Sequence, residues 1–210
     1  MMDNKEKMIE YHLKARGIED EKVLQAMERV DRELFVPIEM KAHAYDDSPL
    51  PIGRGQTISQ PYIVAYMAEA LDIQPTDKVL EIGSGCGYNA AVLAQMAKQV
   101  YSVEIIEWLS NLAKKNLLHA GVTNVDIRFG DGYQGWEEQA PYDKIILTAA
   151  APKIPEPLKK QLRVGGLLLG PVSDSYQKLL LLKKIGENEF TQHELLPVRF
   201  VPMTGQSQQE

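Results

Sequence analysis

A buried strand that runs into a glycine-rich turn constrains the fold of this chain more than any other segment. Residues 78–82 form a short, mainly apolar run, glycines follow at positions 83, 85 and 87, and a helical pattern covers residues 88–98. Glycine at a strand-to-helix turn reaches backbone angles that other residues avoid and lets the main chain approach a ligand. The next helix points its unpaired N–H groups at the same place. The segment therefore predicts a site for a nucleotide-type cofactor.

The spacing of the glycines separates two kinds of cofactor site. A dinucleotide-binding turn has the pattern G-x-G-x-x-G, whereas this chain has the shorter G-x-G-x-G, preceded by the acid Glu81. The shorter turn resembles the first motif of S-adenosylmethionine-dependent methyltransferases. That cofactor carries an amino group and no pyrophosphate, so a nearby carboxylate favours its binding. A glycine-rich turn without any ligand is the alternative.

An acid at the end of the next strand supports a nucleoside ligand. The pattern at residues 100–104 predicts a strand that ends at Glu104, 21 residues after Gly83. A ribose-binding carboxylate is expected about 20 residues beyond a glycine turn of this kind. The alternative is a solvated glutamate that opens the following helix.

Composition excludes several classes of protein. The chain has 210 residues, of which 44% are hydrophobic and 25% charged, as in an ordinary globular domain. Its net charge of −6 argues against nucleic-acid binding, and a single cysteine, Cys86, excludes an intramolecular disulfide. The sequence has no apolar run long enough for a membrane span and no signal-peptide core. We therefore expect a cytoplasmic monomer that binds neither nucleic acid nor membranes.

Strand and helix patterns alternate after residue 77. Five predicted strands alternate with helices expected at 88–98, 107–119 and 155–163, and the strands lie at residues 78–82, 100–104, 124–129, 143–148 and 166–172. This alternation predicts an α/β fold with a doubly wound, mostly parallel Rossmann-like sheet and helices on both faces. Residues 178–185 and 192–201 predict an antiparallel C-terminal hairpin, and the order of these last two strands stays open.

The N-terminal part predicts a helical extension. Helices are expected at residues 5–16 and 20–30, the second with Asp20 as N-cap, and at 61–71, which has a proline in its first turn. Between them, residues 37–61 are rich in Pro, Gly, Ser and Asp, and predict mainly loop with a short helical turn before Tyr45. We expect residues 205–210 to fray.

Other candidate site residues lie in loops. Gly130-Asp131-Gly132 follows the third of these strands, where Asp131 could bind an adenine amino group or form a plain turn. Small residues at 148–152 follow the fourth strand and leave room for a reacting group. Ser59 lies in the long loop, where it either serves the site or caps the helix that starts at Pro61.

The segment 49–61, and above all Thr57-Ile58-Ser59-Gln60-Pro61, resembles the signature of protein-L-isoaspartate O-methyltransferases. Seven further segments resemble this family in the same order: 32–37, 44–46, 79–88, 130–132, 140–143, 161–166 and 199–202. The likeness covers about residues 10–204. Small exchanges at Ser84, Cys86, Asn89 and Ser173 depart from the commonest family pattern without changing the bulk of the glycine turn.

The resemblance implies an activity and a mechanism. The enzyme would transfer the methyl group of S-adenosyl-L-methionine to the free α-carboxyl of L-isoaspartyl residues in damaged proteins and peptides, leaving S-adenosyl-L-homocysteine. The ester would then collapse to a succinimide, which hydrolyses partly to aspartate. Because a carboxylate is ionised at neutral pH, no general base and no metal are needed, and alignment of the reactants should dominate.

The resemblance also implies which residues form the site. Ser59 would be the catalytic residue, acting by positioning the carboxylate rather than as a nucleophile. The residues that would bind the cofactor come from the loop, the glycine turn and the ends of the next two strands: Gln56, Thr57, Ile58, Glu81, Gly83, Ser84, Gly85, Gly87, Glu104, Ile105, Asp131 and Gly132. We further expect residues 197–203 to pair with the main chain of a substrate peptide.

Domain organisation follows from these assignments. We expect a single methyltransferase domain, with N-terminal helices and substrate loop in residues 1–60, the cofactor-binding core in 61–172, a hairpin in 173–204 and a tail in 205–210. Two other functions stay open: a methyltransferase of the same fold that acts on a small molecule, and a non-catalytic cofactor-binding module.

Overall fold

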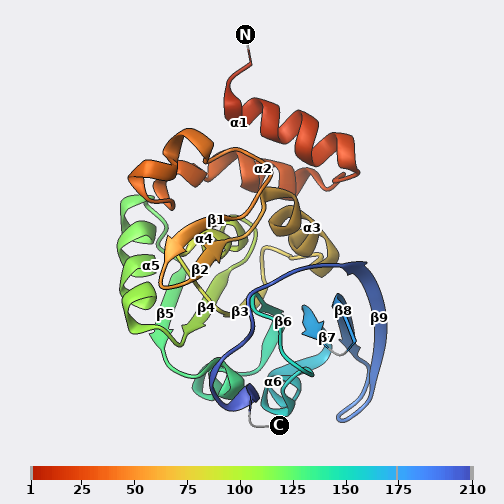
Figure 1. The fold of residues 1–210 in the computed structure, drawn as a ribbon. Coiled ribbons are helices and arrows are strands. Elements are labelled where there is room, and N and C mark those ends of the chain that lie inside the picture. Colours follow the sequence, from red (N-terminus) through yellow and green to blue (C-terminus); the bar gives the residue numbers. More distant parts are fainter. Residues whose placement is uncertain (1, 174, 209–210) are drawn as a thin grey trace.

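The computed structural model describes residues 2–173 and 175–208, and its centre is a seven-stranded sheet (Figure 1). The strands lie in the order β5-β4-β3-β6-β7-β8-β9. Their bounds are β3 Lys78–Ile82, β4 Gln99–Glu104, β5 Val125–Phe129, β6 Tyr142–Leu147, β7 Leu162–Ser173, β8 Gln177–Lys184 and β9 Phe190–Pro197. The five strands from β3 to β7 are parallel to one another. β8 and β9 are antiparallel additions at one edge. The predicted sheet and hairpin are confirmed, and the order of the last strands is defined.

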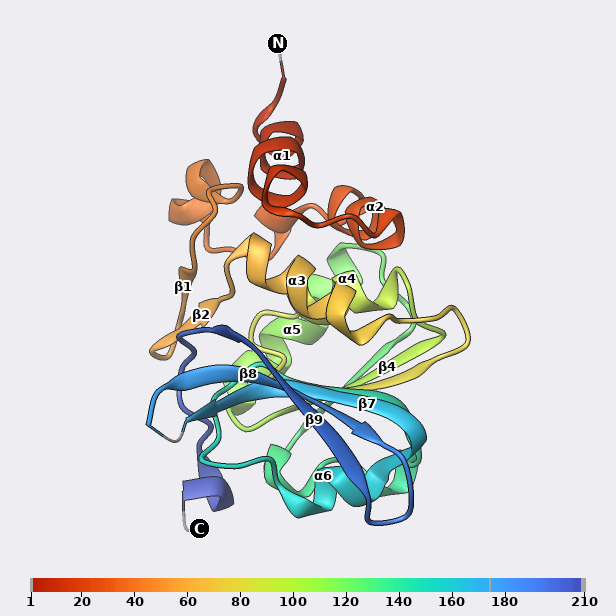
Figure 2. The same ribbon diagram turned by 90° about the vertical axis from the view of Figure 1, so that its right-hand side faces the viewer.

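Helices cover both faces of this sheet (Figure 2). Three lie over one face and one over the other: α3 Pro61–Leu71, α4 Tyr88–Ala94 and α5 Glu107–His119, with α6 Glu156–Gln161 opposite. Because successive strand residues point to opposite faces, Val79 packs in the core with α3 and α4, whereas Leu80 packs in the core with α6. Among the helices of residues 2–173 and 175–208, none has the length and apolar character needed to span a bilayer.

The N-terminal helices form an outer layer against α3 (Figures 1 and 2). The first helical stretch ends at Gly17, whose φ of 90° is left-handed, and it has three parts: α1 Asn4–Lys7, a π-helical segment Met8–Leu13 and a 3₁₀ turn Lys14–Arg16. The second helix, α2 Glu21–Arg29, has Asp20 as its N-cap, as predicted.

The segment expected to be mainly loop contains a small hairpin. The 3₁₀ turn Ile38–His43 confirms the helical turn before Tyr45, but β1 Leu50–Gly53 and β2 Gln56–Ile58 pair as antiparallel strands. Strands this short carry too little alternation to be recognised. The hairpin also depends on a distant contact, because its tip lies against the ring of Trp108.

Two helix and strand boundaries differ from the prediction. α4 ends at Ala94 rather than at residue 98, because the side-chain amide of Asn124 donates to the main-chain oxygens of Ala94 and Ala97. β7 begins at Leu162, four residues earlier than the pattern predicts, since pairing with β6 already starts there.

The C-terminal segment differs more. β9 ends at Pro197 rather than at residue 201, because proline has no N–H for the ladder, and the chain then leaves the sheet. Residues 205–208, expected to fray, form the 3₁₀ turn Gly205–Gln208 with Ser207 buried, whereas residues 209–210 of the expected tail lie outside the described residues.

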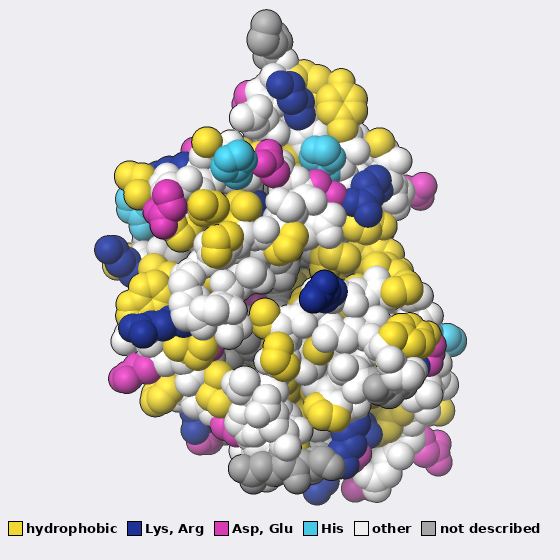
Figure 3. Space-filling view, viewed as in Figure 1, with side chains coloured by type: hydrophobic (Ala, Val, Ile, Leu, Met, Phe, Trp, Pro, Cys, Tyr) yellow, Lys and Arg dark blue, Asp and Glu magenta, His cyan; other side chains and the backbone are white. Residues whose placement is uncertain are grey.

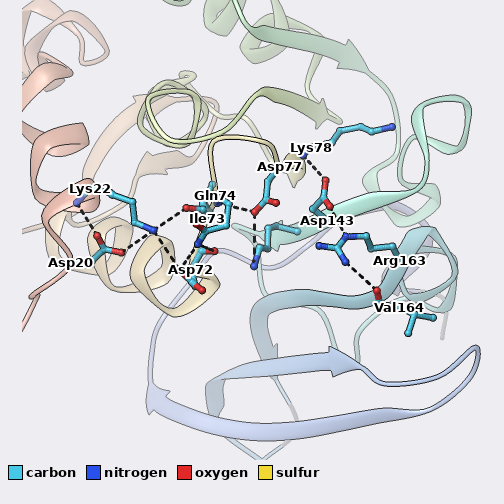
Figure 4. A network of polar contacts seen from close by, with 11 residues as sticks. Asp20, Lys22, Asp72, Ile73, Gln74, Asp77, Lys78, Asp143, Arg163 and Val164 are labelled. Carbon is cyan, nitrogen blue, oxygen red and sulfur yellow. Dashed lines mark hydrogen bonds and ion pairs between the residues drawn. The ribbon is translucent and has the colours of Figure 1, made fainter.

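Polar contacts close the amino-terminal edge of the sheet (Figure 4). The N–H of Lys78 donates to the Asp143 carboxylate at 2.7 Å, and the same carboxylate accepts from Arg163. The Asp77 carboxylate accepts the N–H of Gln74 at 2.9 Å. These contacts bind the starts of β3 and β6 together and leave ligand binding to the opposite, carboxyl edge.

Candidate active site

A pocket lies at the carboxyl ends of β3, β4 and β6, where ligands bind in open parallel sheets. The β1–β2 hairpin and residues 201–204 complete its wall, and Figure 3 shows the surface hollowed near the middle of this face. Ten of the predicted site residues line the pocket: Gln56, Thr57, Ile58, Ser59, Gly83, Ser84, Gly85, Glu104, Ile105 and Gly132.

The glycine turn forms a cradle of main-chain atoms in which a side chain at Gly83 would clash. Gly83 has a φ of 98° and donates its N–H to the Val103 oxygen at 2.8 Å. A Cβ at Gly83 would lie 2.4 Å from Oγ1 of Thr148, which donates to the Gly83 oxygen at 2.6 Å. Gly85, with φ of 52°, donates its N–H to Glu104 at 2.8 Å. Main-chain atoms are thus held open towards the pocket.

Ser84 gives the pocket an unpaired polar group that a polar ligand could bind. Its side chain is 4% exposed and lines the pocket, and its Oγ has no hydrogen-bond partner within the described residues. A buried hydroxyl left unpaired costs about 1–3 kcal/mol. A cofactor with an amino acid and a nucleoside part fits, because its polar groups would supply the missing partner.

Glu104 has the position expected of a residue that binds ribose. Its two carboxylate oxygens accept the N–H groups of Gly85 and Ile106, at 2.8 and 2.9 Å. Burial raises the pKa of Glu104, and the hydrogen bonds from Ile106 and Gly85 oppose that shift. Each oxygen keeps a second lone pair for a diol.

Glu81 does not line the pocket, although the sequence places it there. Residues 79 and 81 of β3 share a face, so the Glu81 side chain points towards α4 and is 0% exposed. Its carboxylate accepts from the hydroxyl of Ser102 and from Nδ2 of Asn89 at 2.7 Å. Burial raises the pKa of Glu81 to about 7, against these two hydrogen bonds, and the Glu104 charge adds to the rise. Glu81 therefore meets the pocket through Asn89, which lines it.

Gly87 and Asp131 also lie outside the lining. Gly87 is the N-cap of α4, with φ of 90°, and a Cβ there would meet the Ala113 main chain at 3.3 Å, so its role is close packing of α4 on α5. The Asp131 carboxylate accepts the N–H groups of Tyr133 and Gln206, at 2.9 and 2.8 Å. It thereby fastens the C-terminal turn beside the pocket.

Ser59 stands at the end of the hairpin, opposite the glycine turn. The capping alternative is wrong: the N-cap of α3 is Gln60 and no side chain caps it there. The Asp47 carboxylate instead accepts the N–H of Tyr62 at 3.1 Å and Nε2 of Gln60 at 2.8 Å. The Ser59 hydroxyl is therefore not used by the helix.

A strap, residues 198–204, closes the pocket from the C-terminal side. The N–H of Ala150 donates to the Val201 oxygen at 2.8 Å, and the N–H of Met203 donates to the Ala150 oxygen at 2.7 Å. The N–H of Val198 is bonded to Gln177. Several main-chain groups expected to pair with a substrate peptide are therefore already used within the chain.

Sequence reasoning missed part of the lining. The additional residues are Val64, Ile82, Cys86, Tyr88, Asn89, Val103, Ile106, Leu109, Thr148, Ala149 and residues 201–204. Thr148 and Ala149 had a signal, since small residues follow β6 at the same sheet edge. Residues 201–203 lie in the segment 197–203 that we expect to meet the substrate peptide, but their place in the pocket wall depends on where the strap crosses the sheet. No group of three or more His, Cys, Asp or Glu side chains is placed to hold a metal in the part of the chain described.

These features define a class of protein. The glycine cradle lies where the strand order reverses, it lacks the longer turn of a pyrophosphate site, and an acid follows at the end of the neighbouring strand. Together they are typical of S-adenosylmethionine-dependent methyltransferases. The sequence profile of the family Protein-L-isoaspartate(D-aspartate) O-methyltransferase matches residues 3–208, and the chain belongs to this family.

Curated relatives match over most of their length. The chain is 50% identical over 207 residues to Protein-L-isoaspartate O-methyltransferase 1 of Geotalea uraniireducens, covering 98% of this chain and 94% of the relative. It is 52% identical over 203 residues to Protein-L-isoaspartate O-methyltransferase 2 of Pelobacter propionicus, covering 96% and 90%.

Solved structures agree as well. One protein-L-isoaspartate O-methyltransferase superimposes with a TM-score of 0.87 at 32% identity, covering 96% of this chain and 66% of that longer chain. A Plasmodium falciparum structure named for the same methyltransferase, in complex with S-adenosyl-L-homocysteine, has a TM-score of 0.83 at 27% identity, covering 97% and 99%.

Proposed function

We propose that this chain is a protein-L-isoaspartate O-methyltransferase, which methylates the free α-carboxyl of L-isoaspartyl residues in damaged proteins and peptides and so starts their repair through a succinimide. The observation that carries the proposal is one pocket with two unlike walls. A glycine cradle for S-adenosylmethionine faces the hairpin end that presents Ser59. Family membership over residues 3–208 supports the same activity.

The cofactor-binding residues follow from the first wall. Gly83, Ser84 and Gly85 would hold the amino acid part through main-chain groups and the unpaired hydroxyl, and Glu104 would hold the ribose. Ile105 and Gly132 would border the adenine. When bound, S-adenosylmethionine supplies a methyl group on a positively charged sulfur. The hairpin and the strap line this place on two sides.

The acceptor is held by the second wall. Its carboxylate is already ionised at neutral pH, since carboxyl groups have pKa values of about 4. No proton has to be removed, so the chain needs to bind and orient the carboxylate rather than activate it. The Ser59 hydroxyl, which does not cap α3, is the donor we assign to this carboxylate. Ordered placement of the acceptor is the main contribution of the hairpin.

Two synthetic peptides that differ only at one L-isoaspartyl or L-aspartyl residue test the function. With methyl-labelled S-adenosylmethionine, we expect label to enter the isoaspartyl peptide and to be released as methanol in mild base, as for a methyl ester. Equal labelling of both peptides, or of neither, would overturn the proposal. Transfer to a small carboxylic acid in preference to the isoaspartyl peptide would identify a small-molecule methyltransferase instead.

The cytoplasmic location, the monomeric state and the action of the chain as one domain stay predictions from the sequence. Gel filtration with light scattering at several protein concentrations measures whether the chain is a monomer. Isoaspartyl proteins are the partners that the proposed activity requires.

A further inference from the structure

The buried guanidinium of Arg32 lies directly behind the end of the β1–β2 hairpin, beside Ser59. Arg32 is 0% exposed and starts the 3₁₀ turn Arg32–Leu34. One terminal nitrogen donates to the Ala44 oxygen, and the other donates to the oxygens of Ser48, at 3.1 Å, and Ser59, at 3.0 Å. All three partners are main-chain oxygens: two lie in the segment before β1 and one directly follows β2.

The charge of Arg32 is not paired directly with a carboxylate. Within residues 2–173 and 175–208, it forms no ion pair with a carboxylate, and its Nε has no hydrogen-bond partner. Burial lowers the pKa of Arg32, against the charges of neighbouring groups such as Asp47 and Asp46. Burial of a charge without a partner costs several kcal/mol, so packing alone does not explain an arginine here. An apolar side chain of similar size would fill the space at lower cost.

The shape of the guanidinium gives its contacts a geometric role. Its planar fork holds two terminal nitrogens at fixed relative positions, which the single ammonium of lysine does not reproduce. The fork therefore fixes the distance between the Ala44 oxygen on one side and the Ser48 and Ser59 oxygens on the other. These carbonyl groups belong to the turn before β1 and to the residue that follows β2.

The main chain at Ser59 is constrained on all other sides. Ile58 pairs with Leu50 in the hairpin, and Gln60 precedes a proline, which keeps its backbone extended. The Asp47 carboxylate holds the Gln60 side chain at 2.8 Å. Arg32 binds the carbonyl oxygen of Ser59, between these two constrained residues.

Arg32 also contacts the helix that follows the glycine turn. Its guanidinium carbon lies 5.7 Å from the ring centroid of Tyr88, the first residue of α4 after the glycine turn. Tyr88 is 1% exposed and lines the pocket. One side chain thus contacts both the residue that follows the glycine turn and Ser59, whose hydroxyl we assign as the donor to the acceptor carboxylate.

We propose that Arg32 is a positioning residue for methyl transfer, which sets the place of the Ser59 hydroxyl relative to the glycine cradle. The inference rests on the proposed function for its catalytic meaning. The reaction neutralises the acceptor carboxylate, so a nearby positive charge would stabilise the starting state more than the transition state. The benefit of Arg32 therefore lies in geometry, where a displacement of about 1 Å can cost about 100-fold in rate.

A double-mutant cycle tests whether Arg32 acts through Ser59. We expect Arg32→Lys to lower kcat for the isoaspartyl peptide about 10- to 100-fold, with the affinity for S-adenosyl-L-homocysteine changed less than about 3-fold. In a Ser59→Ala background the same change should lower kcat less than about 2-fold, because the hydroxyl to be positioned is gone. Independent effects in the two backgrounds, or a parallel loss of cofactor affinity, would overturn the proposal.

Lys184→Met is the matched structural control. Lys184 is another buried cation that donates to two main-chain oxygens, those of Lys159 and Leu162, but it lies on β8 away from the pocket. The Lys184→Met variant should have a lower melting temperature than the parent chain and the same kcat. An equal loss of kcat in both variants, measured per folded molecule, would reduce Arg32 to a structural role.

Hydrogen exchange separates this inference from the proposed function. We expect Arg32→Lys to speed exchange in residues 56–62 and to leave residues 99–104 as in the parent chain, whereas Lys184→Met should not affect 56–62. This result requires no methyl acceptor. Unchanged exchange in 56–62 would refute positioning by Arg32 even if the peptide is methylated, and a parent chain that methylates no isoaspartyl peptide would refute the function alone.

Discussion

The two walls of the pocket are built in different ways. The sheet wall, which consists of the glycine turn and the ends of β3, β4 and β6, is held by the sheet itself: the N–H groups of Gly83 and Gly85 bond to β4 residues at 2.8 Å. The loop wall, which consists of residues 56–59 and the strap, is held by a few side chains and one isolated bridge at Ala150. Buried acids lie behind the first wall, and a buried arginine lies behind the second.

This difference teaches how one fold serves two ligands. The donor is the same molecule in every turnover, and a rigid cradle with fixed main-chain groups suits it. The acceptor is a damaged residue in many sequence contexts, and it meets a short hairpin attached by side chains. Changes at Ser59 in the loop wall should therefore alter acceptor use while leaving donor binding intact, whereas changes in the sheet wall should affect the donor first.

Gly83→Ala is the most damaging change to the sheet wall. The new Cβ would lie 2.4 Å from Thr148 Oγ1 on a backbone with φ of 98°. A left-handed conformation costs about 1–2 kcal/mol and overpacking about 1–3 kcal/mol, so we expect a loss of about 2–5 kcal/mol. Urea unfolding measures the part of this loss that falls on stability, and calorimetry with S-adenosyl-L-homocysteine measures the part that falls on cofactor affinity.

Gly17→Ala is its control, because Gly17 has a φ of 90° with no atom within 4 Å of the added Cβ. It should show the backbone cost alone. If both variants lose the same stability and keep full affinity, the cradle is not set by the Thr148 contact.

The buried acid of the sheet wall predicts a pH dependence of stability. Burial raises the pKa of Glu81 from its ordinary value of 4.5 to about 7, so the folded chain keeps a proton that the unfolded chain has released. The free energy of unfolding should therefore fall as pH rises from 4.5 to about 7, by on the order of 3 kcal/mol. Glu104, whose pKa burial also raises, contributes in the same direction.

Urea unfolding at a series of pH values measures this slope. Glu81→Gln keeps the shape of the side chain and cannot ionise, so its slope should be much flatter. The same fall in stability in Glu81→Gln would show that other groups cause it.

Ser59→Ala tests the loop wall directly. Loss of one hydrogen bond to a charged group costs about 1.5–3 kcal/mol, so kcat should fall roughly 10- to 150-fold. Affinity for S-adenosyl-L-homocysteine should stay within about twofold, because main-chain groups of the sheet wall hold the donor. Complete loss of cofactor binding would contradict the division of the two walls. Ser110→Ala removes a buried hydroxyl outside the pocket lining and should change neither quantity.

Trp108→Ala should have the smallest effect. The ring lies at 5.5 Å from the Arg54 guanidinium carbon and supports the hairpin tip at Gly53. An exposed cation–π contact is worth about 0.5–1 kcal/mol, so the KM of the isoaspartyl peptide should rise about 2- to 5-fold. Leu118→Ala, an 81% exposed position on the same helix, is the control. Equal peptide kinetics in both variants would mean that the tip contact does not matter.

The same division separates what the sequence predicts from what it does not. The sheet wall follows from local signals: an apolar strand, glycines at fixed spacing, and a proline at the first position of α3, which begins at residue 61 as predicted. Its one misplaced side chain, Glu81, was recoverable, since residues 79 and 81 must share a face. Here the fold is set by short-range patterns.

The loop wall could not be predicted in the same way. The hairpin at 50–58 depends on Trp108, about 50 residues later, and the strap depends on a bridge between Ala150 and Pro202. Arg32 carries no local sign that it binds carbonyl groups on both sides of the hairpin. Such contacts join distant parts of the chain, so they appear only when the tertiary structure is known. The family likeness identified Ser59 without showing what holds it.

The strap has a consequence for how the protein is made. A chain is synthesised from its N-terminus, and domains generally begin to fold as their residues emerge. The hairpin and the glycine turn emerge early, but the wall stays open until residues 201–204 have joined Ala150. A chain still in synthesis at residue 200 thus has a cradle without a lid. The pocket wall is therefore completed only after residues 201–204 have been made and have joined Ala150.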